Sequence, residues 1–475
     1  MNDRQRTLPN IIVFIADQLR YDALGCNGNQ YVKTPHIDAI AADAVVFDNA
    51  YVCQPLCVPQ RCSMLTGLYP SSHGSNCNGI PLDESLPVYP ELLRQFGYQT
   101  FAAGKLHFAP ISREFGPNPY EPGEVPNKMP YYGFEAVEFI EGEGSGYVRM
   151  LNHSGFPCKN PHDDLSYDHD GPFQTTIDHL PEALNRSTYV ADKSLHFLQN
   201  RDQTKPFLMH CSFWDPHHPF VIPASFEDLY NPDEMPLPIP YSAEDFDNLP
   251  QHFKKFYERN WPEQGKSFAK HSTADWQRII AHYYGMISLM DKNIGRIMAG
   301  LRENNLEQDT IIIFVSDHGE LLGDHGLALK GTFHYEGTLK VPLMVNYPKQ
   351  YKAGRVATRV MSYDIMPTIL DFAGITIPKR ITAKTLCPLL ENPQAARADL
   401  VIIESPNTRT VIKGDFKLNY HLQNGDGQLY NLKDDPQETV NLWEDMVSVR
   451  AEMLAACLYG TVKTLKPRAS RIGPW

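Results

Sequence analysis

Residues 11–18 read IIVFIADQ, a run of six apolar residues that ends directly at Asp17 and Gln18. A short apolar run bounded by polar residues predicts a strand buried on both faces, as in a mostly parallel sheet. Similar runs lie at residues 100–103, 207–213, 310–315 and 341–346. Apolar residues recur at helical spacing between them, notably in residues 35–44 and 274–301. This alternation predicts an α/β domain whose mostly parallel central sheet is flanked by helices.

The C-terminal part of the chain has a different pattern. Short runs separated by turns lie at residues 400–404, 410–412, 417–421 and 428–431, and a helical pattern follows from 444 to 459. Since 475 residues exceed the size at which one hydrophobic core usually stops growing, we expect two domains. We predict a large domain over residues 1–378 and a smaller α+β domain over 379–475, with an antiparallel sheet and one helix.

Residues 108–180 are rich in Pro, Gly, Tyr and acidic side chains and show no sustained period. Long irregular stretches inside compact domains tend to be functional loops. We therefore expect this stretch to line a pocket, with a solvated insertion as the alternative.

Charge and composition limit the classes of partner. The formal net charge is −13 at pH 7, whereas a nucleic-acid-binding face needs clustered Lys and Arg, so we expect no nucleic-acid partner. No apolar run has the length of a membrane span, and the first run is too short for a signal peptide. Nine scattered cysteines favour a reducing compartment, so we predict a cytoplasmic protein. A signal peptide trimmed from the chain would instead place it in the periplasm or outside the cell.

Residues 57–67 read CVPQRCSMLTG. A lone Cys57 would most often be a small core residue, and a metal cluster is a second alternative because other cysteines lie nearby at 53, 62 and 77. The cysteine spacings fit neither zinc ribbons nor iron–sulfur sites, however. Pro59 suits the first turn of a helix, and Arg61 lies four residues beyond Cys57 on the same helical face. A helix N-terminus together with this guanidinium predicts an anion site.

Two polar pairs follow predicted strands. Asp17 and Gln18 come directly after the first strand, and Asp317 and His318 follow the strand predicted at residues 310–315. Because ligands of open α/β sheets bind at the carboxyl ends of the strands, the two pairs predict a divalent-cation site near Cys57. Read alone, each Asp could equally cap a helix or a turn. Calcium prefers oxygen ligands, and the imidazole also suits manganese, so we predict Ca²⁺ first and Mn²⁺ second.

The pattern Cys57-x-Pro59-x-Arg61 followed by Leu65-Thr66-Gly67 resembles the stretch by which sulfatases mark one cysteine for oxidation to formylglycine. The chain resembles sulfatases of the alkaline phosphatase superfamily from residue 10 to the segment LYNLKDDPQETVNL at residues 429–442. The resemblance implies an alkaline phosphatase-like large domain, a formylglycine derived from Cys57, one divalent metal and a formylglycine-generating maturation enzyme as a partner. Family sulfatases often carry Asp-Asp and Asp-Asn where this chain has its Asp-Gln and Asp-His pairs.

The same resemblance assigns further site residues. Lys105 and His107, in AGKLHFAP, match the sulfatase Gly-Lys-x-His motif, which phosphonate monoester hydrolases with the same cysteine motif generally lack. His217, in FWDPHHPF, falls where sulfatases keep a histidine that faces the leaving-group oxygen, and Lys330, in LALKGTFHYEG, matches their second active-site lysine. The substrate pocket is predicted to include His73, Asn78 and Arg409.

The resemblance predicts hydrolysis of a sulfate ester, either a small molecule or an oligosaccharide. A sulfated carbohydrate is the first choice, and an aryl or choline sulfate is the alternative. In this scheme Arg61 and Lys105 hold the sulfate, His217 and Lys330 help the alcohol to leave, and His107 takes the proton that allows sulfate to be expelled. A phosphonate monoester or phosphodiester hydrolase with the same aldehyde and metal is the second hypothesis. An inactive sulfate-binding relative is the third.

Overall fold

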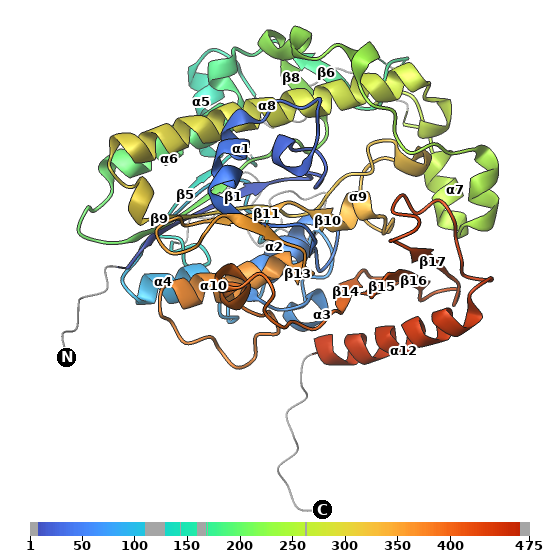
Figure 1. Ribbon diagram of the computed structural model, residues 1–475. Coiled ribbons are helices and arrows are strands. Elements are labelled where there is room, and N and C mark those ends of the chain that lie inside the picture. The colour runs from blue at the N-terminus through green and yellow to red at the C-terminus, as the bar shows by residue number, and fades with distance from the viewer. Residues whose placement is uncertain are drawn as a thin grey trace, which may run out of the picture.

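The computed structural model describes residues 8–109, 129–142, 144–158, 168, 170–261 and 264–465. Its centre is an eight-stranded sheet in the order β12-β2-β11-β9-β1-β7-β4-β5. Figure 1 labels β1, β5, β9 and β11 of this sheet. The strands are β1 Asn10–Ala16, β2 Ala44–Phe47, β4 Gln99–Gly104, β5 Ala136–Phe139, β7 Phe207–Ser212, β9 Thr310–Ser316, β11 Leu343–Asn346 and β12 Gly354–Val356. All neighbouring pairs are parallel except those made by β11. The predicted mostly parallel α/β sheet is confirmed.

Strand β1 lies in the middle of the sheet because both of its faces are apolar. One face contributes Ile11, Val13 and Ile15 to one hydrophobic core, and the other contributes Ile12, Phe14 and Ala16 to a second. Successive side chains of a strand point to opposite faces, so an uninterrupted apolar run is what a strand between two layers of helices requires.

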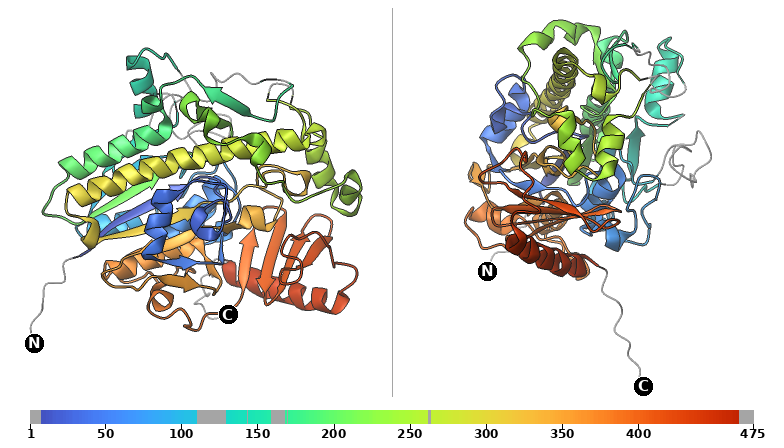
Figure 2. Two further views of the ribbon diagram at one scale, coloured as in Figure 1. Left: turned by 45° about the horizontal axis from the view of Figure 1, so that its top comes forward. Right: turned by 90° about the vertical axis from the view of Figure 1, so that its right-hand side faces the viewer.

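Helices cover both faces of the sheet (Figures 1 and 2). Helices α1 Pro35–Ala42, α6 Arg186–Asn200 and α8 Thr273–Glu303 build the core on one face, and α2 Cys57–Thr66, α4 Tyr89–Gln95 and α10 Ile365–Phe372 build the core on the other. The long helix α8 begins with a reciprocal cap. Asp275 N donates to Ser272 Oγ at 3.2 Å, and Ser272 N donates to Asp275 Oδ2 at 2.8 Å.

The C-terminal part forms a four-stranded antiparallel sheet with α12 along one face (Figure 1). The elements are β14 Val401–Glu404, β15 Thr408–Lys413, β16 Phe416–His421, β17 Gly427–Asn431 and α12 Val447–Thr464. Met453 and Cys457 of α12 are buried against the strands, and their core continues into that of α2 and α10. The predicted small antiparallel sheet with one helix is confirmed, while the boundary at residue 378 stays a prediction.

Shorter elements connect these layers. They are β3 Ala50–Tyr51, β6 Thr175–Asp178, β8 Phe220–Pro223, β10 Lys340–Val341, β13 Val360–Met361, α3 Pro70–His73, α5 Gly146–His153, α7 Gln251–Tyr257, α9 Glu336–Leu339 and α11 Cys387–Glu391. Strands β10, β3 and β13 form a three-stranded sheet, and β6 pairs with β8. In the part of the chain that the structure describes, no helix is long and apolar enough to cross a membrane.

Several predicted bounds were wrong. The C-terminal helix predicted at 444–459 begins at Val447 and ends at Thr464. The run at residues 341–346 is divided at Pro342, which lacks an N–H for strand pairing, so β10 and β11 belong to different sheets. The helix predicted at 35–44 ends at Ala42, and β2 begins at Ala44. The stretch 108–180 is not irregular throughout, because it contains β5, α5 and β6. Residues 110–128 and 159–167 of this predicted pocket wall lie outside the described residues.

Candidate active site

Two aspartates meet at the carboxyl edge of the central sheet. Strands β1 and β9 are parallel neighbours with Ala16 opposite Ser316, so Asp17 and Asp317 leave the sheet side by side. Gln18 N donates to Asp317 Oδ1 at 3.1 Å, although Gln18 has a φ of 68°. The hydroxyl of Tyr283 on α8 donates to Gln18 O at 2.7 Å and supports this turn from the other side. The backbone is therefore held where both carboxylates face one space.

Cys57 approaches the aspartates from the first residue of α2. Its Sγ lies 3.1 Å from His318 Nε2 and 3.9 Å from Asp17 Oδ1. The four ligand atoms that Asp17, Cys57, Asp317 and His318 offer lie within 4.8 Å of one another, and all four residues are buried. Two carboxylates and an imidazole beside the cysteine fit a divalent cation, because hard cations take carboxylate oxygens and manganese also accepts imidazole.

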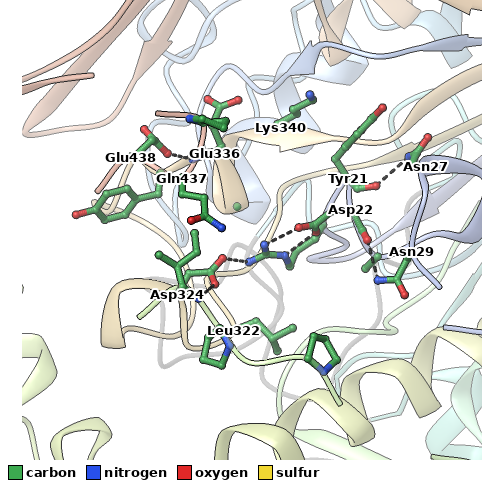
Figure 3. A pocket seen from close by; sticks show the side chains of 18 of the residues that line it. Tyr21, Asp22, Asn27, Asn29, Leu322, Asp324, Glu336, Lys340, Gln437 and Glu438 are labelled. Carbon is green, nitrogen blue, oxygen red and sulfur yellow. Dashed lines mark hydrogen bonds and ion pairs between the residues drawn. The ribbon is translucent and has the colours of Figure 1, made fainter. Parts of the chain in front are cut away.

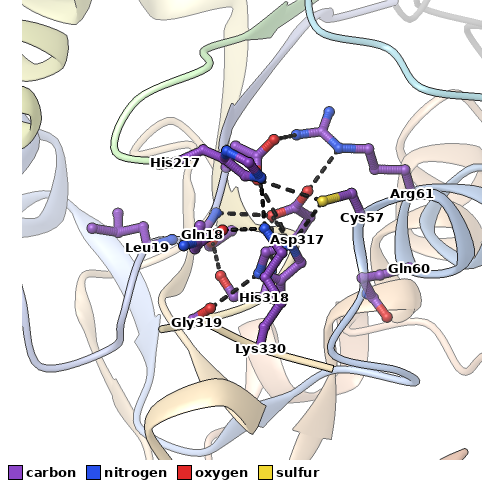
Figure 4. A network of polar contacts seen from close by, with 12 residues as sticks. Gln18, Leu19, Cys57, Gln60, Arg61, His217, Asp317, His318, Gly319 and Lys330 are labelled. Atoms are coloured by element: carbon purple, nitrogen blue, oxygen red, sulfur yellow. Dashed lines mark hydrogen bonds and ion pairs between the residues drawn. The ribbon is translucent and has the colours of Figure 1, made fainter. Parts of the chain in front are cut away.

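Arg61 and Lys105 balance the two carboxylates. Figure 4 shows Arg61 beside Asp317 and Cys57. Arg61 Nε lies 2.7 Å from Asp317 Oδ2, and Lys105 Nζ lies 2.5 Å from Asp17 Oδ2 and 4.0 Å from Cys57 Sγ. Arg61 Nη1 is held in turn by the Lys105 carbonyl at 2.6 Å and by Ser212 Oγ at 2.8 Å. Buried charges are tolerated only when they are paired and hydrogen-bonded, so these contacts make a rigid charged site.

The charges in this cluster shift the pKa values of its acids. Burial alone would raise the pKa of Asp17, but the charges of Lys105 and Arg61 outweigh it and leave the pKa below its ordinary value. Burial and the Asp17 charge raise the pKa of the Cys57 thiol, yet Lys105, Lys330 and the neighbouring imidazole lower it further than that. The site therefore favours a negative group at position 57.

Lys330 and His217 form a second contact on the other side of Gln18. Lys330 Nζ donates to His217 Nε2 at 2.6 Å and also to Gln18 Oε1. His217 Nδ1 donates to the carbonyl of His218, which leaves Nε2 as the acceptor. Burial lowers the pKa of His217 well below its ordinary value, with further contributions from His218, Lys105 and Lys330, so the ring is neutral.

His107 lies two residues beyond Lys105 with a φ of 55°. Burial lowers its pKa well below the ordinary value, and the charges of Lys105 and Arg61 add to the shift. Its Nδ1 atom is buried without a hydrogen-bond partner among the described residues. A neutral ring with an uncommitted nitrogen can accept a proton.

The structure brings together nine of the predicted site residues: Asp17, Gln18, Cys57, Arg61, Lys105, His217, Asp317, His318 and Lys330. His73, Asn78 and Arg409 have other contacts. His73 Nε2 lies 3.0 Å from Ser63 Oγ, and Arg409 donates to the carbonyl of Ser405. Asn78 Oδ1 accepts from Val58 N at 3.1 Å, so it caps the helix that carries Cys57.

Four residues around the site were not predicted. Ser212 at the end of β7 holds Arg61, and the ring of Trp214 lies 4.1 Å from Lys105 Nζ. Glu320 accepts from the Gln18 amide, and His218 Nδ1 lies 3.1 Å from Gln18 Nε2. Ser212 and Trp214 border a strand end and His218 adjoins His217, which are the only sequence signals that could have indicated them.

A polar cavity of about 930 Å³ is lined by none of the predicted site residues. Arg20 lines it and pairs with Asp324 at 2.7 Å and with Asp22 at 2.8 Å. Figure 3 shows Asp22 and Asp324 among the lining residues. Glu336 and Lys340 also line it. Most of its acidic groups are already paired, Asp22 and Asp324 with Arg20, and Glu336 and Glu438 with Lys417, so size alone does not make it a reaction site.

Comparison with known proteins identifies the family. The family model that describes sulfatases matches residues 9–375 of the chain. The chain belongs to the sulfatase family. A model for the C-terminal region of N-sulphoglucosamine sulphohydrolase matches residues 323–457 of this sulfatase. The resemblance stated from the sequence is confirmed, and the chain is a sulfuric ester hydrolase. Membership implies a formylglycine and a divalent metal, and the buried group at Cys57 could bind one.

Individual relatives agree with this family. An arylsulfatase from Clostridium perfringens is 32% identical over 454 residues, which cover 91% of this sulfatase and 90% of that protein. An N-acetylglucosamine-6-O-sulfatase from Bacteroides thetaiotaomicron is 27% identical over 500 residues, covering 92% and 82%. Among solved structures, a phosphonate monoester hydrolase from Agrobacterium radiobacter superimposes with a TM-score of 0.82 at 25% identity, over 96% of both chains.

Proposed function

We propose that this sulfatase hydrolyses sulfate esters of carbohydrates, using formylglycine made from Cys57 and one divalent ion held by Asp17, Gln18, Asp317 and His318. The main support for this proposal is the position of Lys105, whose ammonium lies between Asp17 and Cys57. A fixed positive charge at that point stabilises the negative charge of a sulfuryl group in the transition state. Oxidation of Cys57 requires a formylglycine-generating enzyme as a partner.

The two groups supply chemistry that no ordinary side chain provides. Formylglycine, when formed, supplies a hydrated aldehyde as nucleophile, and the bound ion supplies charge that makes this hydroxyl more acidic. Arg61 and Lys105 orient the sulfate and hold its oxygens. Both are buried and tied to aspartates, so their charges are already in place and cost no reorganisation during the reaction.

The Lys330–His217 pair protonates the departing alcohol. His217 accepts from Lys330 at Nε2 and is neutral, so the proton available at this contact belongs to the ammonium. Lys330 therefore acts as the acid. His107, neutral and with Nδ1 uncommitted among the described residues, acts as the base that restores the resting site.

Calcium is our first choice of ion. Asp17 and Asp317 offer carboxylate oxygens, which calcium prefers, and the Gln18 amide oxygen would join them by exchanging its contact with Lys330. The single imidazole of His318 keeps manganese second. All four ligand residues are buried, so the ion would be shielded from water. Restoring activity to chelated protein with each ion in turn separates the two assignments.

A cavity next to the site supports the proposal that the leaving alcohol is a carbohydrate. It has a volume of about 430 Å³ and is lined by Trp214, Asp215, Asp178, His179 and Arg186 among other residues. Trp214 also contacts Lys105, so the cavity adjoins the proposed sulfate position. An aromatic face with a few polar groups is typical of a small-molecule site. The N-acetylglucosamine-6-O-sulfatase relative supports the same class.

Phosphonate monoester hydrolysis is the second candidate. The similarity to the hydrolase from Agrobacterium radiobacter and the Asp-Gln and Asp-His pairs favour it. Lys105 and His107 argue against it, since such hydrolases generally lack both.

The deciding experiment compares turnover of an aryl sulfate with that of a phenyl phosphonate monoester. The protein is co-expressed with a formylglycine-generating enzyme and supplied with calcium or manganese. We expect kcat/KM to favour the sulfate strongly. Preference for the phosphonate would overturn the roles given to Lys105 and His107, and the second candidate would replace the first.

A further inference from the structure

His334 connects the loop that carries Lys330 to the C-terminal sheet. It lies four residues beyond Lys330 and is 1% exposed. Its Nδ1 atom lies 2.7 Å from Thr410 Oγ1, and its Nε2 atom lies 2.8 Å from Ser405 Oγ. Both nitrogens of one buried side chain are therefore bonded to residues of the small sheet and its first turn.

The sheet meets His334 with a row of buried polar side chains. Thr410 on β15, Asn419 on β16 and Gln428 on β17 are cross-strand neighbours and are each at most 1% exposed. Thr410 Oγ1 donates to Asn419 Oδ1 at 2.7 Å, and Asn419 Nδ2 donates to the carbonyl of His334 at 3.3 Å. Polar groups inside a sheet cost free energy unless they are bonded. Thr410 and Asn419 of this row are therefore bonded to His334, in the loop that carries Lys330.

The hydrogen bonds assign one tautomer to His334. Thr410 has a single hydroxyl hydrogen and donates it to Asn419, so its oxygen accepts from His334 Nδ1–H. Nε2 then accepts from the hydroxyl of Ser405. Burial lowers the pKa of His334 well below its ordinary value, and the charge of Lys417 adds to the shift, so the ring stays neutral.

The other anchors of this loop lie on both sides of Lys330. Leu329 N donates to the carboxylate of Glu320. Phe333 packs between Phe253 and Phe256 of α7, with ring centroids 4.9 and 4.8 Å apart. Phe333 anchors the loop by apolar packing, whereas His334 adds directional hydrogen bonds that fix the position of the loop relative to the C-terminal sheet. Lys330 is thus held between residues 329 and 334.

We propose that His334 is a positioning residue that holds Lys330 in contact with His217 and thereby sets how efficiently the leaving alcohol is protonated. The proposal rests on the proposed function, since it acts through the role given to Lys330. In this proposal the C-terminal sheet contributes to the reaction indirectly. It holds His334, and the backbone of residues 330–334 connects His334 to Lys330.

The test uses phenyl sulfates whose leaving groups differ in acidity. p-Nitrophenolate leaves without much help, whereas phenolate depends on protonation. We expect His334→Phe to lower kcat/KM for phenyl sulfate about 10-fold or more beyond its effect on p-nitrophenyl sulfate, since a positioned acid contributes roughly 10²–10⁴-fold. His334→Gln, which keeps a donor and an acceptor, should recover part of this loss. The double variant Lys330→Met, His334→Phe should show no selectivity beyond that of Lys330→Met alone.

His271→Phe is the matched control. His271 is also buried with both ring nitrogens bonded, to Phe173 N and Ser267 O, but no described contact joins it to the Lys330 loop. It should lower thermal stability and leave the leaving-group dependence unchanged. Equal loss on both substrates in His334→Phe would overturn the inference alone. Unchanged leaving-group dependence in Lys330→Met would overturn the proposed role of Lys330 and the inference with it.

Discussion

Replacing Lys105 with Met tests the charge at the centre of the site. Lys105 Nζ lies 4.0 Å from Cys57 Sγ, the atom that marks the reacting side chain. Two unit charges at this distance interact by about 4 kcal/mol at an effective dielectric constant of about 20. That energy corresponds to a rate factor on the order of 10³. Because Arg61 remains close to the same sulfate position, we expect Lys105→Met to lower kcat by about 10²–10³-fold.

The assay is steady-state hydrolysis of p-nitrophenyl sulfate by protein whose formylglycine content has been measured by mass spectrometry. Lys417→Met is the control, because Lys417 is equally buried and paired with Glu336 and Glu438, while no described contact joins it to Cys57. Both variants should lose thermal stability, and only Lys105→Met should lose turnover on this scale. A loss of less than tenfold in correctly oxidised Lys105→Met would refute the electrostatic argument.

Four further outcomes are expected. Cys57→Ser should become sulfated once and then stop, because an ester of serine cannot expel sulfate as an aldehyde hydrate can; a mass spectrum without the added sulfuryl group, or continued turnover, would contradict this. A chelator should abolish hydrolysis, and added calcium or manganese should restore it; activity that survives exhaustive chelation would count against the metal. Asn78→Ala should lower the free energy of unfolding by about 1 kcal/mol through loss of the cap on Val58 N, measured by urea denaturation. Burial raises the pKa of Asp291, a buried residue of α8, to about 7. The folded state therefore keeps a proton that the unfolded chain releases near pH 4. The contribution of Asp291 to the free energy of unfolding then falls as pH rises from about 4 to 7. Asp291→Asn should therefore be less sensitive to pH than the parent over this interval in the same urea assay, and identical pH profiles would disprove it.

Much of the site could be predicted because its residues depend on local rules. Asp17 and Asp317 each follow an apolar strand, and parallel strands end at one edge of a sheet. Cys57 and Arg61 are one helical turn apart, and their helix begins where the sequence indicated. Such features need only periodicity and topology, so they could be read before any three-dimensional contact was known.

The remaining residues depend on tertiary contacts that have no local signal. Glu320 accepts a hydrogen bond from Gln18, and Ser212 accepts one from Arg61. In both pairs the two residues are far apart in the sequence. His73 lies near Cys57 in sequence, but the short helix α3 directs it to Ser63. Strand β2 has only four residues and directly follows a helix, so its apolar run could not be separated from the helical pattern before it.

The burial of Cys57 has a consequence for the order of events during protein synthesis. Its side chain is covered by His318, 261 positions later in the chain. At roughly 5–20 residues per second, a ribosome would need on the order of 10–50 s to reach that residue. Under the proposed conversion of Cys57 to formylglycine, a maturation enzyme would reach the segment around Cys57 during this interval, before β9 packs against β1. Proteins that miss it would fold around an unoxidised thiol that is 1% exposed, so the fraction of active enzyme would be decided by a race between translation and oxidation.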